Sequence, residues 1–188
     1  RVRDDYTSLV SAGSGGSRGV ILDLRQNGGG SLSSAWNLTD FLGPSSVDNQ
    51  IMFSLQQQSQ GFDYRFGVYG SNLGITDPSK FVILIDGSSA SASELTSAAL
   101  KDLGIATLMG GITYGKGVGQ NVVGLLDGSG VYITSFELLS PLGNSWHNLG
   151  VSPDYPLSTA LPATPADDTL LQAAIDFIET GSVRQATT

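Results

Sequence analysis

Short apolar runs alternate along the chain with glycine-rich turns. Two runs, residues 19–24 and 80–86, are almost wholly apolar, and each is followed at once by a turn rich in glycine or serine. A third run, residues 105–109, ends at a pair of glycines. Short, continuous apolar runs bounded by turn residues are typical of strands that are buried on both faces. We therefore predict three buried strands over these ranges.

Helical periodicity follows the first two predicted strands and returns near the end of the chain. Apolar residues recur at helical spacing in three segments, which are residues 31–42, 92–103 and 167–179. Asp167 or Asp168 is the expected N-cap of the last helix. The residues of that helix expected to face inward are Leu170, Leu171, Ala174, Ile175 and Ile178. The order of strand, turn, helix and strand predicts an α/β fold.

The other segments give a weaker pattern. Residues 45–79 are polar and irregular, and they predict one or two short strands with loops. Two apolar segments, residues 122–126 and 131–136, flank an Asp-Gly-Ser-Gly turn and predict a β-hairpin. No repeat of fixed period is present. A chain of 188 residues with this content predicts a single domain over residues 1–188.

Composition and charge narrow the classes of function. Hydrophobic residues make up 40% and charged residues 14% of the chain, as in soluble globular proteins, and no apolar run is long enough to cross a bilayer. The net charge of −8 argues against nucleic acid or an anionic membrane as a partner. Cysteine is absent and His147 is the only histidine, in a segment expected to be an exposed turn. We predict neither a metal site nor a cofactor.

Ser91 lies in the turn Asp86-Gly-Ser-Ser-Ala-Ser-Ala-Ser-Glu94, between a predicted strand and a predicted helix. At a helix N-terminus, free backbone N–H groups and the helix dipole stabilise a developing oxyanion. The position therefore suits a nucleophilic serine. It also suits a purely structural N-cap, and Ser89 and Ser93 are alternative nucleophiles by composition. Glu94 is expected to complement the helix dipole.

Lys116 lies in a glycine-rich stretch, Thr113-Tyr-Gly-Lys-Gly-Val-Gly-Gln120. Such a loop can direct a lysine inward, where burial lets the amine lose its proton and act as a base. A solvated lysine in a turn is the alternative. A phosphate-binding Walker loop does not fit, because Gly117 stands where that motif needs serine or threonine.

A third motif, Asp23-Leu-Arg-Gln-Asn-Gly-Gly-Gly30, follows the first predicted strand. A glycine-rich turn in this position can offer backbone N–H groups to a negatively charged oxygen. The dinucleotide-binding pattern of glycines is absent. We expect Asp23 and Arg25 to hold the loop through an ion pair and to take no part in chemistry.

Together the three motifs resemble the tail-specific, or C-terminal processing, serine peptidases of family S41. The family motif D-L-R-x-N-x-G-G corresponds to residues 23–30, S-A-S-A-S-E to residues 89–94, and T-[FY]-G-K-G-x-x-Q to residues 113–120. A Gly-Val-Ser-Pro-Asp sequence at residues 150–154 matches the family's G-V-x-P-D. The resemblance spans residues 19–156. One departure is Gly28, which stands where the family loop often has proline.

The resemblance implies a mechanism and a fold. Ser91 would attack the scissile carbonyl, and Lys116 would accept its proton and return it to the leaving amine. Gln120 would help to orient the lysine, and the backbone N–H groups of Gly29 and Ala92 would form the oxyanion hole. The family fold is a ClpP/crotonase-like α/β spiral of strand–turn–helix units. The implied substrates are polypeptides, as unfolded or C-terminal segments. The composition, with many Gly, Ser, Thr and Asn residues and few Lys, favours an extracytoplasmic (periplasmic or secreted) location.

The PDZ domain with which this family usually holds a substrate's C-terminus is not among the 188 residues. We expect either the catalytic core of a longer protein or a branch of the family without that module. Two other functions on this fold stay open, namely a non-proteolytic module that binds hydrophobic ligands or peptides, and an acyl-CoA enzyme of the crotonase type. Neither requires a serine and a lysine at this spacing.

Overall fold

The computed structural model of the chain describes residues 19–43, 45–57, 62–67 and 77–183. It confirms the α/β prediction. A parallel sheet has the order β1-β4-β5-β8 and is built from β1 (Val20–Asp23), β4 (Phe81–Ile85), β5 (Thr107–Gly110) and β8 (Tyr155–Pro156). An antiparallel sheet has the order β3-β2-β7-β6 and is built from β2 (Ile51–Gln57), β3 (Phe62–Gly67), β6 (Val118–Gly124) and β7 (Gly130–Leu139).

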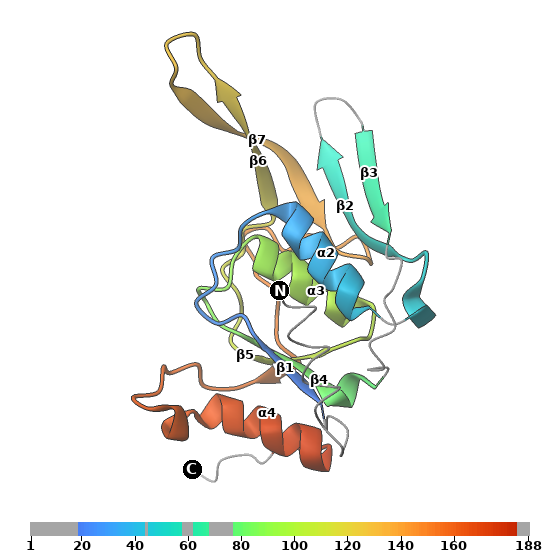
Figure 1. The fold of residues 1–188 in the computed structure, drawn as a ribbon, viewed down its shortest axis with the longest axis vertical. Coiled ribbons are helices and arrows are strands. Elements are labelled where there is room, and N and C mark those ends of the chain that lie inside the picture. The colour runs from blue at the N-terminus through green and yellow to red at the C-terminus, as the bar shows by residue number, and fades with distance from the viewer. Residues whose placement is uncertain (1–18, 44, 58–61, 68–76, 184–188) are drawn as a thin grey trace.

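Helices cover both faces of the parallel sheet (Figure 1). On one face lie α2 (Leu32–Leu42) and α3 (Ala92–Asp102), which pack on each other, and on the other lies α4 (Thr169–Thr180). The described residues also form three single turns of 3-10 helix, namely η1 (Ser45–Val47), η2 (Pro78–Lys80) and η3 (Pro165–Asp167). No helix in the described part of the chain is both long and apolar enough to cross a membrane.

The central strand β4 separates two hydrophobic cores. Phe81, Ile83 and Ile85 pack into the core beneath α2 and α3, whereas Val82 and Leu84 pack against α4. All five side chains are fully buried. Because successive side chains of a strand point to opposite faces, a strand covered on both sides is apolar throughout. This arrangement explains why residues 80–86 form an unbroken apolar run.

The structure differs from the sequence prediction in α4 and in the hairpin. The buried residues of α4 are Leu170, Ala174, Phe177 and Ile178, whereas Ile175 is 36% exposed. The prediction that Ile175 faces inward is therefore wrong, because the buried stripe follows i, i+4, i+7 and i+8 and leaves residue i+5 at its margin. The hairpin strands β6 and β7 are both longer than predicted, and the turn between them lies where the Asp-Gly-Ser-Gly sequence predicted it.

Three loops meet at one edge of the parallel sheet. They follow the carboxyl ends of β1, β4 and β5 and comprise residues 24–31, 86–91 and 111–117. Since parallel strands end at the same edge, the fold brings these loops together although they are far apart in sequence. They contain the three motifs found in the sequence.

Candidate active site

Ser91 is the N-cap residue of α3, in the turn that follows β4. Its backbone angles are φ 56° and ψ −114°, in a region that residues other than glycine rarely adopt. Ser89 is fully buried, and its hydroxyl donates to the carbonyl oxygen of Leu24 at 2.8 Å. Ser93 is also buried, whereas Ser91 is partly exposed. Of the three serines, Ser91 is therefore the one that a molecule at the surface reaches most readily.

The carboxylate of Glu94 holds the serine turn against the lysine loop. Its oxygen Oε2 accepts the backbone N–H of Ser91 at 2.7 Å and that of Lys116 at 2.8 Å. Its oxygen Oε1 accepts the Thr113 hydroxyl and the Gly115 N–H, both at 2.6 Å. The side chain is fully buried. Four donors around one buried carboxylate fix the backbone of Ser91 and the backbone of Lys116 relative to each other.

The sequence did not predict this role of Glu94, which was expected only to complement the dipole of the helix. Its position three residues after Ser91 is the spacing of a capping box, in which the glutamate side chain accepts the N–H of the N-cap residue. That spacing was the available signal for the bond to Ser91. The bonds to the lysine loop depend on the tertiary fold and have no such local signal.

The opposite side of the lysine loop packs on residues 145–150. A side chain at Gly117 would place its Cβ 2.8 Å from the backbone nitrogen of His147, so the two backbones are in direct contact. Trp146 is only 4% exposed, and its burial contradicts the prediction of an exposed turn around His147. The physical reason is that Trp146 belongs to the hydrophobic core beneath α3.

Gly29 lies directly against the serine turn. A Cβ at Gly29 would lie 2.5 Å from the carbonyl oxygen of Ala90 and 2.8 Å from the backbone nitrogen of Ala92, and the residue has a φ of 92°. This approach accounts for glycine at position 29. The Gly29 N–H donates to the side-chain oxygen of Asn27 at 2.9 Å. The carbonyl oxygen of Asn27 accepts the N–H of Ala90 at 3.0 Å, which joins the two loops.

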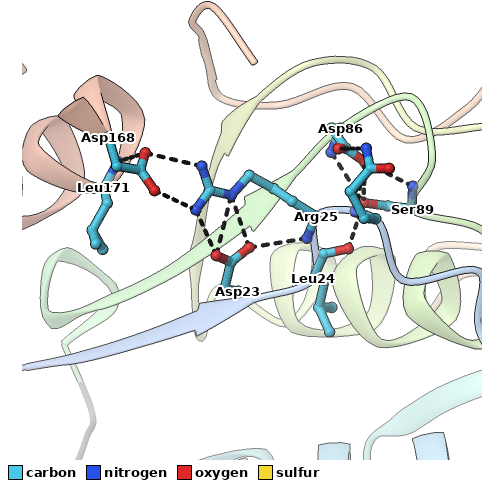
Figure 2. Close-up of polar contacts among 8 residues, drawn as sticks. Asp23, Leu24, Arg25, Asp86, Ser89, Asp168 and Leu171 are labelled. Atoms are coloured by element: carbon cyan, nitrogen blue, oxygen red, sulfur yellow. Dashed lines mark hydrogen bonds and ion pairs between the residues drawn. The ribbon is translucent and has the colours of Figure 1, made fainter. Parts of the chain in front are cut away.

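Arg25 anchors the glycine loop, as Figure 2 shows. Its guanidinium donates to both oxygens of Asp23 and, at 3.0 and 2.7 Å, to both oxygens of Asp168. The structure confirms the expected ion pair with Asp23 and adds Asp168, the N-cap of α4, which also accepts the Leu171 N–H at 3.0 Å. The hydrogen bonds from Arg25 hold the pKa of Asp168 below its usual value.

Asp86 joins the same loop to the serine turn (Figure 2). Its carboxylate accepts the backbone N–H of Gln26 at 3.1 Å, the side-chain amide of Gln26 at 2.6 Å and the N–H of Ser89 at 3.0 Å. Burial acts to raise the pKa of Asp86, but hydrogen bonds from Gln26, Ser88 and Ser89 outweigh it and lower the pKa. The loop carrying Gly29 is thus tied both to α4 and to the serine turn.

Gln120 lies further from this cluster. It is exposed on β6, opposite Thr134 of β7. Among the described residues, no hydrogen bond joins its side chain to Lys116. The structure therefore brings together Ser91, Ala92, Gly29 and the backbone of Lys116.

A cavity of about 150 Å³ opens beside Gly29 and Ala92. Its walls come from the glycine loop and from the facing sides of α2 and α3, and they include Leu24, Ala35 and Leu38. The cavity lies next to the serine turn, and polar side chains of the two helices also line it, namely Ser34, Ser93 and Thr96. Its size suits a small side chain.

Fold and site together define an α/β protein with a strained serine turn between a buried strand and a helix, an arrangement typical of nucleophilic serines. The family follows from comparison with known sequences. The model of peptidase family S41 matches residues 3–157, and the chain belongs to this family.

Individual relatives agree with this assignment. The carboxyl-terminal-processing protease of Synechocystis sp. is 35% identical over 170 residues, which cover 88% of this chain and 38% of that protein. The chloroplastic C-terminal processing peptidase of Tetradesmus obliquus is 37% identical over 142 residues, which cover 76% of this chain and 29% of that protein. The chain thus corresponds to well under half the length of these relatives.

Solved structures share the fold. The photosystem II D1 C-terminal processing protease superposes with a TM-score of 0.74 at 32% identity, over 92% of this chain and 42% of that one. A lipoprotein from Streptococcus agalactiae superposes with a TM-score of 0.67 over 94% of this chain and 58% of that one. Its sequence identity of 18% makes it evidence for the fold alone.

Proposed function

We propose that the chain is the catalytic part of a serine endopeptidase in which Ser91 is the nucleophile and Lys116 is its base. The observation that carries the proposal is the Glu94 carboxylate, which accepts the backbone N–H groups of both residues on one oxygen. A Ser/Lys pair works only if the hydroxyl and the amine are held within reach of each other. The buried carboxylate fixes the two backbones relative to each other, which supports this pairing.

The proposed reaction is acyl transfer to the serine. The Ser91 oxygen attacks the substrate carbonyl as its proton passes to the unprotonated Lys116 amine, and the amine then returns this proton to the leaving nitrogen. Water attacks the resulting ester in the second half of the reaction, again with Lys116 as base. Gln120 is proposed to orient the amine once substrate is bound, because the family resemblance gives it that role and its strand β6 begins two residues after Lys116.

The negative charge on the substrate oxygen is proposed to be stabilised by the N–H groups of Ala92 and Gly29. Ala92 occupies the first turn of α3, where backbone N–H groups lack a partner within the helix. The Gly29 N–H, next to it, already donates to Asn27. A substrate oxyanion would replace the Asn27 side-chain oxygen as the acceptor of that N–H.

The proposed substrates are polypeptides in extended, unfolded form, including C-terminal segments. The family supports this class, and the cavity beside Ala92 has room for a small side chain next to the scissile bond. An extracytoplasmic location belongs to the same proposal. It is supported by the family and by the small number of lysines, three in the whole chain.

Cleavage of casein by the protein and by two variants tests this proposal. We expect both Ser91→Ala and Lys116→Ala to reduce the cleavage rate at least about a thousandfold, because the two groups act as a unit. Lys101→Ala is the control, since Lys101 pairs with Asp154 and Ser152, away from the serine turn. Equal cleavage by the Ser91 variant and the unaltered protein would exclude the mechanism. Peptide binding without cleavage by the unaltered protein would favour a binding module.

A further inference from the structure

β6 is the outer strand of the antiparallel sheet, and its outer edge begins next to the lysine loop. The sheet order is β3-β2-β7-β6, so in the part of the chain that the structure describes no strand pairs with that edge. Figure 1 shows β6 and β7 extending as a hairpin away from the helices. The strand starts only two residues after Lys116.

Hydrogen bonds at both ends of the hairpin show which backbone groups of β6 are unused. The Leu125 N–H donates to the Ser129 carbonyl oxygen at 2.7 Å, and the Leu138 N–H donates to the Gly117 carbonyl oxygen at 2.8 Å. Because bonds in an antiparallel pair involve every second residue, the odd-numbered residues of β6 face β7. The backbone groups of the even-numbered residues therefore point outward, and these residues are Val118, Gln120, Val122 and Gly124.

The segment just before β6 is bonded to the serine turn. The Tyr114 N–H donates to the carbonyl oxygen of Ser89 at 3.0 Å, and the N–H groups of Gly115 and Lys116 donate to Glu94 at 2.6 and 2.8 Å. The Gly115 carbonyl oxygen accepts the Asn148 N–H at 2.8 Å. The outer edge of β6 therefore begins two residues after a segment that is fixed against the turn carrying Ser91.

The hairpin is also apolar and almost free of charge. Residues 117–126 contain no charged side chain. Val123 and Val131 face each other across the two strands, and with Leu125 and Ile133 they form an aliphatic face whose side chains are 40–49% exposed. An aliphatic face beside an unpaired strand edge suits an extended, uncharged peptide.

We propose that the outer edge of β6 binds the main chain of the substrate as an added strand, and that it selects uncharged, apolar segments some residues away from the scissile bond. This inference rests on the proposed function, because it takes Ser91 as the point from which the substrate runs. Main-chain hydrogen bonds to the outward groups of β6 supply the binding. The aliphatic face of the hairpin excludes charged segments, since a charged side chain would lose hydration there.

Proline substitution tests the edge directly. Val122→Pro removes one outward N–H, and proline is compatible with an edge strand. The matched control is Leu126→Pro in the same hairpin. The Gly128 N–H donates to the Leu125 carbonyl oxygen, so Leu126 is the second residue of a turn, a position that proline favours. Both changes are made in the full chain carrying Ser91→Ala, and binding of a fluorescein-labelled, uncharged Val/Ala/Thr peptide is measured by anisotropy.

We expect Val122→Pro to raise the Kd at least about fivefold, since one main-chain hydrogen bond is lost and the strand edge is disturbed. Leu126→Pro should change it less than about twofold. A second measurement uses the Ser91→Ala protein that keeps Val122, together with a set of peptides that each carry a methyl group on one backbone nitrogen. Methylation should weaken binding at alternate positions only, because alternate N–H groups of an added strand face β6.

The outcomes separate this proposal from the proposed function. Equal binding by the Val122→Pro and Leu126→Pro proteins, uniform effects of methylation, or no binding of the uncharged peptide would overturn the edge as the binding strand. If the unaltered protein fails to cleave casein while Val122→Pro still raises the Kd for the peptide at least about fivefold, the proposal for the β6 edge holds and the proposed peptidase mechanism is wrong.

Discussion

Position 29 leaves no space for a side chain. The Gly29 backbone lies within contact distance of Ala90 and Ala92, and its φ is positive. Its neighbour Gly28 has open space where a Cβ would be. The two adjacent glycines therefore offer a matched pair of substitutions that differ in one contact with the serine turn.

Gly29→Ala should reduce casein cleavage at least about tenfold, because the added methyl group pushes the glycine loop away from Ala92 and strains a positive φ. Gly28→Ala should retain most of the activity. Both proteins are compared by cleavage rate and by urea unfolding. Equal activity of the two variants would show that the approach of Gly29 to Ala92 has no part in the reaction.

Glu94→Gln tests the buried carboxylate that joins the serine turn to the lysine loop. The amide that replaces one carboxylate oxygen cannot accept hydrogen bonds, so buried N–H groups lose their acceptor and unfolding becomes easier by about 2 kcal/mol. Activity should fall further than stability explains, because Ser91 and Lys116 lose their common anchor. Urea unfolding and casein cleavage measure the two effects, with the exposed Asp48→Asn as control. A stable variant with full activity would contradict this role.

At the scale of elements, Arg25 links the glycine loop to α4. It pairs with Asp23 beside it in sequence and with Asp168, which is 143 residues away and caps the last helix. The final helix therefore helps to position the loop that carries Gly29, although it contributes no residue to the site itself.

This link makes stability depend on pH. The pKa of Asp168 is lower in the folded chain than in the unfolded chain, where it is about 4. Its contribution is therefore complete above about pH 4 and is lost as pH falls through the lower folded value. We expect the free energy of unfolding, measured in urea by tryptophan fluorescence, to fall on acidification. The Asp168→Asn variant should have a lower free energy of unfolding at pH 7 and should lose less of it on acidification. The same dependence of the free energy of unfolding on pH in both proteins would contradict this link.

Elements with strong local patterns could be predicted from the sequence. The buried strands β4 and β5 follow from unbroken apolar runs, and α2 and α3 follow from helical periodicity with turn residues at their ends. The prediction that β1 is buried is wrong, because β1 lies at the edge of the sheet and is only partly buried. The exposure of Ile175 and the burial of Trp146 could not be predicted, because each depends on which distant element packs beside it. The same applies to Glu94, whose side chain reaches Thr113, 19 residues further along the chain. Motif spacing identified Ser91 and Lys116 as candidates, whereas the carboxylate between their backbones required the fold.

At the scale of the whole molecule, the parallel sheet brings three loops to one edge, and the antiparallel hairpin extends from that edge. Ser91, Gly29 and Lys116 come from three different loops, which follow β4, β1 and β5. Each loop is tied to another by hydrogen bonds that the oxygens of Asn27, Asp86 or Glu94 accept. These bonds fix the backbones of a serine and a lysine that are 25 residues apart in sequence, as the proposed dyad requires.

Labelling with a fluorophosphonate, which reacts with activated serines, tests the central proposal most directly. Mass spectrometry of the labelled protein is expected to find one adduct, on the peptide that contains Ser91. Lys116→Ala should slow labelling at least about a hundredfold, because the serine loses its base, and Ser91→Ala should abolish it. An adduct on another serine, or labelling of the Lys116 variant at the rate of the unaltered protein, would contradict a Ser91/Lys116 dyad.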